Sequence, residues 1–229
     1  MTGTLYLVAT PIGNLQDISF RALETLKQVD LIACEDTRQA AKLLSCHQIH
    51  KPLVSFHDHN ERSRTPELLQ QLREGRSIAL VSDGGTPLIN DPGWWLVHRA
   101  IEEQVPTSWI PGAAALIGAL ALSGLPTDRF VFEGFLPPKS GARRKRLEAL
   151  RTEERTIIFH ESPHRVVKTL HDIHAVLGNL PMACARELTK KFEEVRRGPV
   201  SELIEFFDHH PPRGEFVLVL RVPHTSARA

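Results

Sequence analysis

The segment 77–93, S-I-A-L-V-S-D-G-G-T-P-L-I-N-D-P-G, constrains the fold more than any other part of the chain. It opens with four apolar residues at 78–81, a run typical of a strand that is buried on both faces. The run stops at S-D-G-G-T-P, where two glycines permit positive φ and a proline ends strand pairing. A second turn, N-D-P-G, precedes a helical pattern over 94–103. This order of strand, loop and helix predicts one unit of a parallel α/β sheet.

Similar apolar runs recur in the first half of the chain, at 4–9, 29–34, 52–56 and 105–110. The helical patterns that separate them lie over 20–28, 37–45 and 65–74. Asp17 or Ser19 is expected to cap the first of these helices, and Thr37 the second. The alternation predicts a doubly wound, mainly parallel sheet with right-handed crossovers. Because the polar, glycine-containing segments all follow strands, we expect them to gather on one rim and to form a site there.

The loop 82–87 has two interpretations. Its glycines let a ligand lie against bare backbone, while Asp83 and Thr86 supply a charge and a hydroxyl group. The alternative is a tight connection that binds nothing. A phosphate loop is excluded, because neither G-x-x-x-x-G-K-[ST] nor G-x-G-x-x-G occurs here.

The pattern changes after Pro111. Residues 112–122, G-A-A-A-L-I-G-A-L-A-L, are small and apolar on all sides and predict a buried helix that begins at Gly112. Its first N–H groups have no partners within the helix and could bond a ligand. The alternative is that the small residues serve only to pack the helix closely on a sheet. Ser201 is expected to cap a later helix. We expect an N-terminal domain over 1–111, a C-terminal domain over 112–223 and a frayed tail over 224–229. The strand patterns of the second domain lie at 130–135, 156–159, 181–185 and 216–222.

Composition limits the classes of protein to consider. The net charge is +1, so a nucleic-acid surface has to be a local patch. Three cysteines are too few for a disulfide framework or a zinc knuckle, and no metal site is expected. No apolar run approaches about 20 residues, so neither a membrane span nor a signal peptide is predicted. We therefore expect a cytoplasmic protein. One basic patch is visible at 139–146, K-S-G-A-R-R-K-R, which has five basic residues and no acidic ones.

Six blocks, in order, resemble the tetrapyrrole methylase superfamily of S-adenosylmethionine-dependent methyltransferases. They are L-Y-L-V-A-T-P-I-G-N-L-Q-D-I-S (5–19), C-E-D-T-R (34–38), S-D-G-G-T-P-L-I-N-D-P-G (82–93), P-G-A-A-A (111–115), F-H-E-S-P-H-R (159–165) and A-R-E-L-T-K-K-F-E-E-V-R-R-G (185–198). The resemblance extends over nearly the whole chain. Two departures stand out: Gly84 replaces the usual alanine, and members of the most similar subgroup commonly continue for several tens of residues past position 229.

The resemblance implies a homodimer whose protomer has two α/β domains and binds S-adenosylmethionine between them. The most similar members methylate the 2′-hydroxyl of a cytidine ribose in the decoding region of small-subunit ribosomal RNA, as free RNA or in the assembled subunit. The family's cofactor contacts map here onto Pro11, Asp83, Gly84, Gly85, Thr86, Gly112, Ala113, Ala114, Ala115, Glu161, Phe216 and Val217.

For such a reaction the protein mainly aligns the acceptor oxygen, and a base adds about 10²- to 10⁴-fold. Glu35 and Asp36 are the first candidates, and Arg38 either grips a phosphate or fixes a carboxylate. The alternative for Asp36 is a simple helix cap. His57, Asn60 and Glu61 form the second candidate set. The catalytic candidates are thus Glu35, Asp36, Arg38, His57 and Glu61.

The basic patch is either a solvated helix face or a set of RNA-phosphate contacts, which position RNA without reading its sequence. The predicted RNA contacts are Lys139, Arg143, Arg144, Lys145, Arg146, Arg165, Arg186 and Lys190. Two rival functions remain open at this point. One is methylation of a small tetrapyrrole precursor, which the basic patch disfavours. The other is a non-catalytic role in RNA binding or ribosome assembly.

Overall fold

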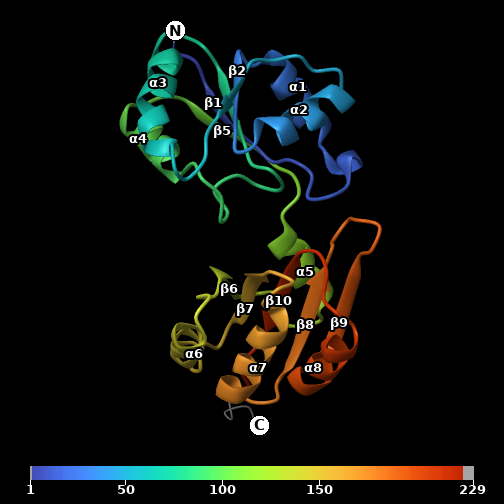
Figure 1. The fold of residues 1–229 in the computed structure, drawn as a ribbon. Coiled ribbons are helices and arrows are strands. Elements are labelled where there is room, and N and C mark those ends of the chain that lie inside the picture. Colours follow the sequence, from blue (N-terminus) through green and yellow to red (C-terminus); the bar gives the residue numbers. More distant parts are fainter. Residues whose placement is uncertain (1, 224–229) are drawn as a thin grey trace. The chain divides into compact units, whose positions relative to one another are not determined.

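The computed structural model describes residues 2–223 and divides into two compact units, Met1–Ala114 and Ala115–Ala229. The division falls three residues after the expected boundary between 111 and 112. The predicted tail, 224–229, lies outside the described residues. Each unit has its own five-stranded sheet (Figure 1).

The sheet of the first unit has the strand order β3-β2-β4-β1-β5, and every neighbouring pair is parallel. This confirms the predicted parallel α/β fold. The central strand β4 is buried along its whole length, as its apolar run indicated. The strands are β1 (Leu5–Val8), β2 (Leu31–Cys34), β3 (Leu53–Ser55), β4 (Ile78–Val81) and β5 (Thr107–Ile110). The helices are α1 (Phe20–Gln28), α2 (Thr37–Cys46), α3 (Glu61–Arg73) and α4 (Trp94–Glu102), with a short 3₁₀ turn, η1 (Leu15–Asp17).

The helix starts of the first unit correct two expectations. Ser19 caps α1 by accepting a hydrogen bond from the amide of Ala22 at 3.1 Å, but Asp36 rather than Thr37 caps α2. Helix α3 begins at Glu61, four residues before the expected start at 65. The reason is the turn that precedes it, in which the carbonyl of His57 already accepts from the amides of Asn60 and Glu61.

The second unit has a mixed sheet of order β6-β7-β10-β8-β9. Only β6 and β7 are parallel; the other pairs are antiparallel. The strands are β6 (Phe130–Phe135), β7 (Thr156–Glu161), β8 (Pro181–Arg186), β9 (Glu194–Pro199) and β10 (Phe216–Leu220). The helices are α5 (Ala115–Ser123), α6 (Ser140–Ala149), α7 (Val166–Leu177) and α8 (Val200–His209).

Helix α5 differs from its prediction in two ways. It begins at Ala115 rather than at Gly112, and it packs on β8 and β10 through one face while Ile117 and Leu122 remain exposed. Small residues on all sides therefore did not mean burial on all sides. The cap expected at Ser201 is also wrong: α8 starts after Pro199, and the amide of Ser201 donates to the side chain of Asn179.

Each unit has its own hydrophobic core. Two apolar clusters cover the faces of the first sheet, one around Leu68 and Leu80 and the other around Leu26 and Ile32. One cluster around Phe159 forms the core of the second unit. Such burial of apolar surface is the main source of folding free energy. Among the described residues no helix is both long and apolar enough to cross a lipid bilayer.

Candidate active site

Three loops meet at the carboxyl ends of β1, β4 and β5, which are neighbours in the first sheet. Thr10, after β1, and Gly85, after β4, exchange two backbone hydrogen bonds of 2.9 and 3.0 Å. The hydroxyl of Thr10 also donates to the carbonyl of Ser82 at 3.2 Å. The third loop follows β5 and contains Ala113. It is joined to the loop after β4 by Thr86, whose hydroxyl donates to the carbonyl of Ala113 at 3.2 Å. The predicted rim therefore exists within the first unit and is held by backbone hydrogen bonds and by two threonine hydroxyls that donate to backbone carbonyls.

Glycine is required where these loops touch. A Cβ atom on Gly112 would lie 2.9 Å from the Cβ of Ala9, which is too close for any side chain. Gly85 has φ +98°, a conformation that favours glycine. Gly84 is different: an added Cβ would lie 3.3 Å from the carbonyl oxygen of Pro11, a tight but tolerable contact. Since Asp83 and Gly84 are exposed while Gly85 is buried, the loop is anchored on one side and open on the other.

Asp36 and Arg38 form a self-contained pair. The amide and guanidinium of Arg38 donate to the Asp36 carboxylate over 2.7–3.1 Å, and the Arg38 side chain is 86% exposed. These hydrogen bonds lower the pKa of Asp36 to about 2, so its carboxylate is a weak base. The structure thus favours the helix-cap alternative for Asp36 and the carboxylate-fixing role for Arg38. The backbone amide of Asp36 donates to Asp83 at 3.0 Å and ties the end of β2 to the glycine loop.

Two other carboxyl groups at this rim have raised pKa values. Burial raises the pKa of Glu35, and the negative charges of Asp83, Asp91, Asp58 and Asp36 raise it further. Burial also raises the pKa of Asp91 to about 6; a hydrogen bond with Ser82 opposes the shift, and the charges of Asp83 and Asp58 add to it. A pKa near the working pH is what a general base needs.

Asp91 was missed because the turn N-D-P-G reads as a helix start. Its position in the same loop as Asp83, eight residues further on, was the available signal.

The loop after β3 mainly supports the rim. The side chain of Asn60 accepts from the amide of His57 at 2.8 Å and donates to the carbonyl of Ser55 at 3.1 Å. Glu61 accepts from the amide of Gly93 at 3.1 Å and so holds the start of α4. Glu61 is therefore a positioning residue. The Nδ1 atom of His57 is buried without a hydrogen-bond partner among the described residues.

The cofactor contacts predicted in the second unit are Glu161, Phe216, Val217 and Ala115, which begins α5. Glu161 is 2% exposed, and its carboxylate accepts from the hydroxyl of Thr169 at 2.6 Å and pairs with Arg165. Phe216 and Val217 lie in β10, paired with β7 on one side and β8 on the other. Their backbone groups are therefore paired within the sheet, and the assignment of Glu161, Phe216 and Val217 to the cofactor stays a prediction.

The predicted RNA-contact set is divided by the structure. Arg143 is wrongly included: it is buried, and its guanidinium pairs with the buried Asp172 at 2.6 Å. Several others already have carboxylate partners, namely Arg144, Arg146, Arg165, Arg186 and Lys190. Lys139 and Lys145 are exposed, and no ion pair to either exists among the described residues.

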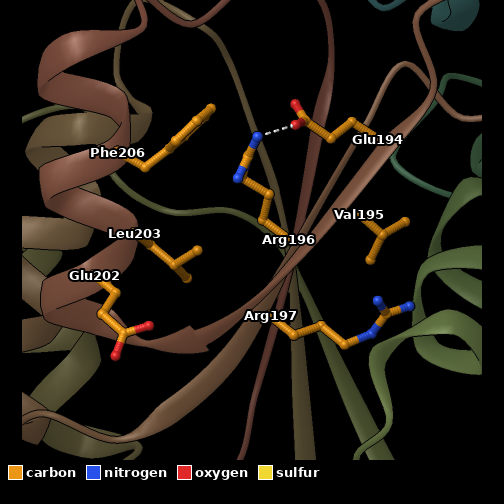
Figure 2. Close-up of a pocket in the computed structure, with 7 residues that line it drawn as sticks. All are labelled: Glu194, Val195, Arg196, Arg197, Glu202, Leu203 and Phe206. Carbon is orange, nitrogen blue, oxygen red and sulfur yellow. Dashed lines mark ion pairs between the residues drawn. The ribbon is translucent and has the colours of Figure 1, made fainter.

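A separate hollow of about 400 Å³ lies between β9 and α8 in the second unit (Figure 2). Arg196 lies there between Glu194 and Phe206: it pairs with Glu194 at 2.6 Å, and its guanidinium carbon lies 3.2 Å from the Phe206 ring centroid. Arg197 points away and donates to the carbonyl of Leu122 at the end of α5 at 2.8 Å. These arginines stabilise the unit, and the hollow contains none of the predicted site residues.

No group of three or more histidine, cysteine, aspartate or glutamate side chains is placed to hold a metal ion within residues 2–223.

Comparison with known proteins identifies the family of this chain. The chain matches the family described as Tetrapyrrole (Corrin/Porphyrin) Methylases over residues 4–204. A relative from Synechocystis sp. is 54% identical over 95% of this chain and 78% of its own length, and one from Thermotoga maritima is 47% identical over 95% and 98%. Both are named ribosomal RNA small subunit methyltransferase I.

Two solved structures share the fold. A diphthine synthase matches with a TM-score of 0.77 at 17% identity, covering 96% of this chain and 90% of its own. The cobalt precorrin-4 methyltransferase CbiF matches with a TM-score of 0.69 at 17% identity, covering 94% of each chain. With a family match over most of its length, and with this fold, the chain belongs to the tetrapyrrole methylases.

Proposed function

We propose that this chain is an S-adenosylmethionine-dependent methyltransferase that methylates the 2′-hydroxyl of a cytidine ribose in the decoding region of small-subunit ribosomal RNA. The observation that carries the proposal is the 54% identity, over 95% of the chain, to a relative named as a small-subunit ribosomal RNA methyltransferase. The open glycine loop on the carboxyl rim of the first sheet supports it, because ligands of parallel α/β sheets bind at such rims.

The residues of the rim fit this cofactor. The exposed backbone at Gly84 permits close approach of a ligand. The carboxyl groups of Glu35, Asp83 and Asp91 lie close enough together for the charge of Asp83 to raise the pKa of both Glu35 and Asp91, and their negative potential is complementary to a sulfonium and an ammonium group. The segment at Ala113 lies beside the loop and adds further backbone groups. When bound, the cofactor supplies a methyl group already activated by a positively charged sulfur.

The chain's own residues then have two tasks. Asp83 and the backbone from Gly84 to Thr86 bind and orient the donor, so that the acceptor oxygen needs only alignment. Asp91, with Glu35 beside it, accepts the proton of the ribose hydroxyl, because its pKa of about 6 leaves it ionised near neutral pH. Exposed Lys139 and Lys145 contact RNA phosphates and position the substrate without reading its sequence.

The test supplies cofactor labelled in its methyl group to purified protein with one of three substrates: assembled small subunits, free small-subunit RNA or a tetrapyrrole precursor. We expect label in RNA, recovered as 2′-O-methylcytidine after nuclease digestion. Label found only in the tetrapyrrole would refute the assignment of RNA as the substrate and would identify a small-molecule methyltransferase. Absence of saturable cofactor binding in calorimetry would leave the non-catalytic alternative. Asp91→Asn is expected to lower the transfer rate by about 10²-fold or more, and Glu148→Gln, on the surface of the second unit, serves as the control.

We also propose that the protein is a homodimer, as the family resemblance implies, and that it acts in the cytoplasm. Sedimentation velocity at micromolar concentration tests the first part. A single species with the mass of one chain would contradict it.

A further inference from the structure

A cluster of aromatic and cationic side chains lies at the amino-terminal ends of α3 and α4, outside the glycine loop at 82–87, which we call the donor loop because it is proposed to bind the methyl donor. These helices pack side by side in the first unit (Figure 1). Trp94 is 62% exposed, although an indole of this size is normally covered. His98 stacks on it, with ring centroids 5.1 Å apart and planes inclined by 6°. Trp95 lies against the same histidine, and the guanidinium carbon of Arg62 is 5.6 Å from the Trp95 ring centroid.

The position of this cluster relative to the donor loop is set by one contact. The amide of Gly93 donates to Glu61, so the starts of α3 and α4 are held together directly after Asp91. Trp94 follows Gly93, and Arg62 follows Glu61. The cluster therefore flanks the proposed base within the same unit.

We propose that Trp94, Trp95, His98 and Arg62 form a stacking platform for an unpaired nucleobase next to the ribose that is methylated. This inference rests on the proposed function, and it names a subsite for the same RNA. A parallel pair of aromatic rings extends readily by one more ring, and every base has a face suited to such stacking. Arg62 is exposed, and among the described residues no carboxylate pairs with it, so its charge is free for a phosphate or for a base.

A protein partner is the alternative occupant, because Ile101 extends the exposed face of α4 by two turns. The immediate neighbours of Trp94 favour RNA. The exposed residues in the loops that precede α3 and α4 are mainly polar or charged, as at Asp58, His59 and Asn90, with Ile89 as an apolar exception. The centre of a protein interface is instead depleted of charge. Continuity with the donor site points in the same direction.

The experiment compares Trp94→Ala, Trp94→Phe and Arg62→Gln with the unaltered protein. Methyl transfer to small subunits gives KM and kcat, and calorimetry gives cofactor affinity. We expect Trp94→Ala to raise KM by about 5- to 150-fold, the range measured for loss of one stacked base, while cofactor affinity stays unchanged. Trp94→Phe should recover most of the loss, because it keeps an aromatic face. Arg62→Gln should raise KM less and weaken its salt dependence.

A second measurement is independent of catalysis. A short cytidine-containing oligoribonucleotide is titrated into the protein, and quenching of tryptophan fluorescence reports stacking. The control is Phe20→Ala, which removes an aromatic ring that is 88% exposed on α1 and for which no stacked ring or cation is present among the described residues.

The outcomes separate the two proposals. If the unaltered protein binds the oligonucleotide through Trp94 but methylates no small subunits, the proposed function fails and the platform stands. If small subunits are methylated and Trp94→Ala changes neither KM nor oligonucleotide binding, the platform is wrong. A Trp94→Ala protein that loses self-association and keeps its RNA affinity would identify the surface as a protein interface and also overturn the proposal.

Discussion

Replacing Asp172 by alanine is expected to destabilise the second unit strongly. Asp172 and Arg143 are each only 4% exposed, and their charged groups lie 2.6 Å apart. The hydroxyl of Ser140 and the guanidinium of Arg144 also donate to Asp172. Removing the carboxylate leaves the charge of Arg143 buried, and its remaining partners among the described residues are the carbonyls of Pro137 and Pro138.

The magnitude follows from this burial. Removing one partner of a buried ion pair costs about 3–5 kcal/mol, because the remaining charge is uncompensated. Arg144 is 54% exposed, so its pair with Asp172 contributes less than about 1 kcal/mol. We therefore expect Asp172→Ala to lower the free energy of unfolding by about 3–5 kcal/mol and Arg144→Ala to lower it by less than 1. The double variant Arg143→Met with Asp172→Leu should recover most of the loss, since apolar replacements of buried pairs are often neutral.

The assay has to report on the second unit. All three tryptophans, at 94, 95 and 109, belong to the first unit, so their fluorescence does not serve here. Urea unfolding followed by circular dichroism gives the free energy, and hydrogen exchange of peptides from α6 and α7 locates the loss. Glu148→Ala, which breaks an exposed pair with Arg151, is the matched control and should leave the free energy of unfolding nearly unchanged. A loss below about 1 kcal/mol for Asp172→Ala would refute the reasoning.

The same network predicts that the contribution of Asp172 to stability depends on pH. Burial alone would raise the pKa of Asp172, but the hydrogen bonds from Arg144, Ser140 and Arg143 outweigh it and hold the pKa below its ordinary value. The ionised form is thus favoured in the folded state, and its stabilisation is complete above the unfolded pKa of about 3.9. As the pH falls below about 4, the difference between the unaltered protein and Asp172→Ala should shrink.

Three further predictions concern the rim and the basic patch. Gly85→Ala forces an L-residue into positive φ at a cost of about 1–2 kcal/mol, so it should weaken cofactor binding in calorimetry more than Gly84→Ala; equal effects would contradict the loop geometry. Asp91→Asn should raise the free energy of unfolding above pH 6 by about 1 kcal/mol, after allowance for solvent screening. It should have no effect below pH 4, because a carboxyl group of raised pKa destabilises the folded state only when it is ionised. Urea unfolding at pH 4 and at pH 7.5 measures this difference. Lys139→Glu with Lys145→Glu should weaken RNA binding in a salt-dependent manner with cofactor affinity unchanged, whereas equal losses of both would indicate misfolding.

Local patterns predicted the first unit well, because its strands are short apolar runs that recur between helices. The run at Ile78–Val81 required burial on both faces, and β4 is accordingly an interior strand of the sheet. Helix boundaries were less predictable. Thr37 and Asp36 are both good capping residues, and the conformation of the preceding strand end decided for Asp36. The helix at Ala115 starts three residues after Gly112, which lies close to Ala9, a contact between distant residues that a local pattern does not contain.

The sequence by itself determined the fold class, the family and the loop at Asp83, since these depend on short-range patterns and on ordered motifs. Only the tertiary structure decided the states of the charged groups. Arg143 and Lys145 look alike in the run K-S-G-A-R-R-K-R, yet one is buried against Asp172, 29 residues away, and the other is exposed. Asp91 likewise has a raised pKa because of burial and its neighbours in space. A charge depends on solvent access and on partners distant in sequence, which local spacing does not contain.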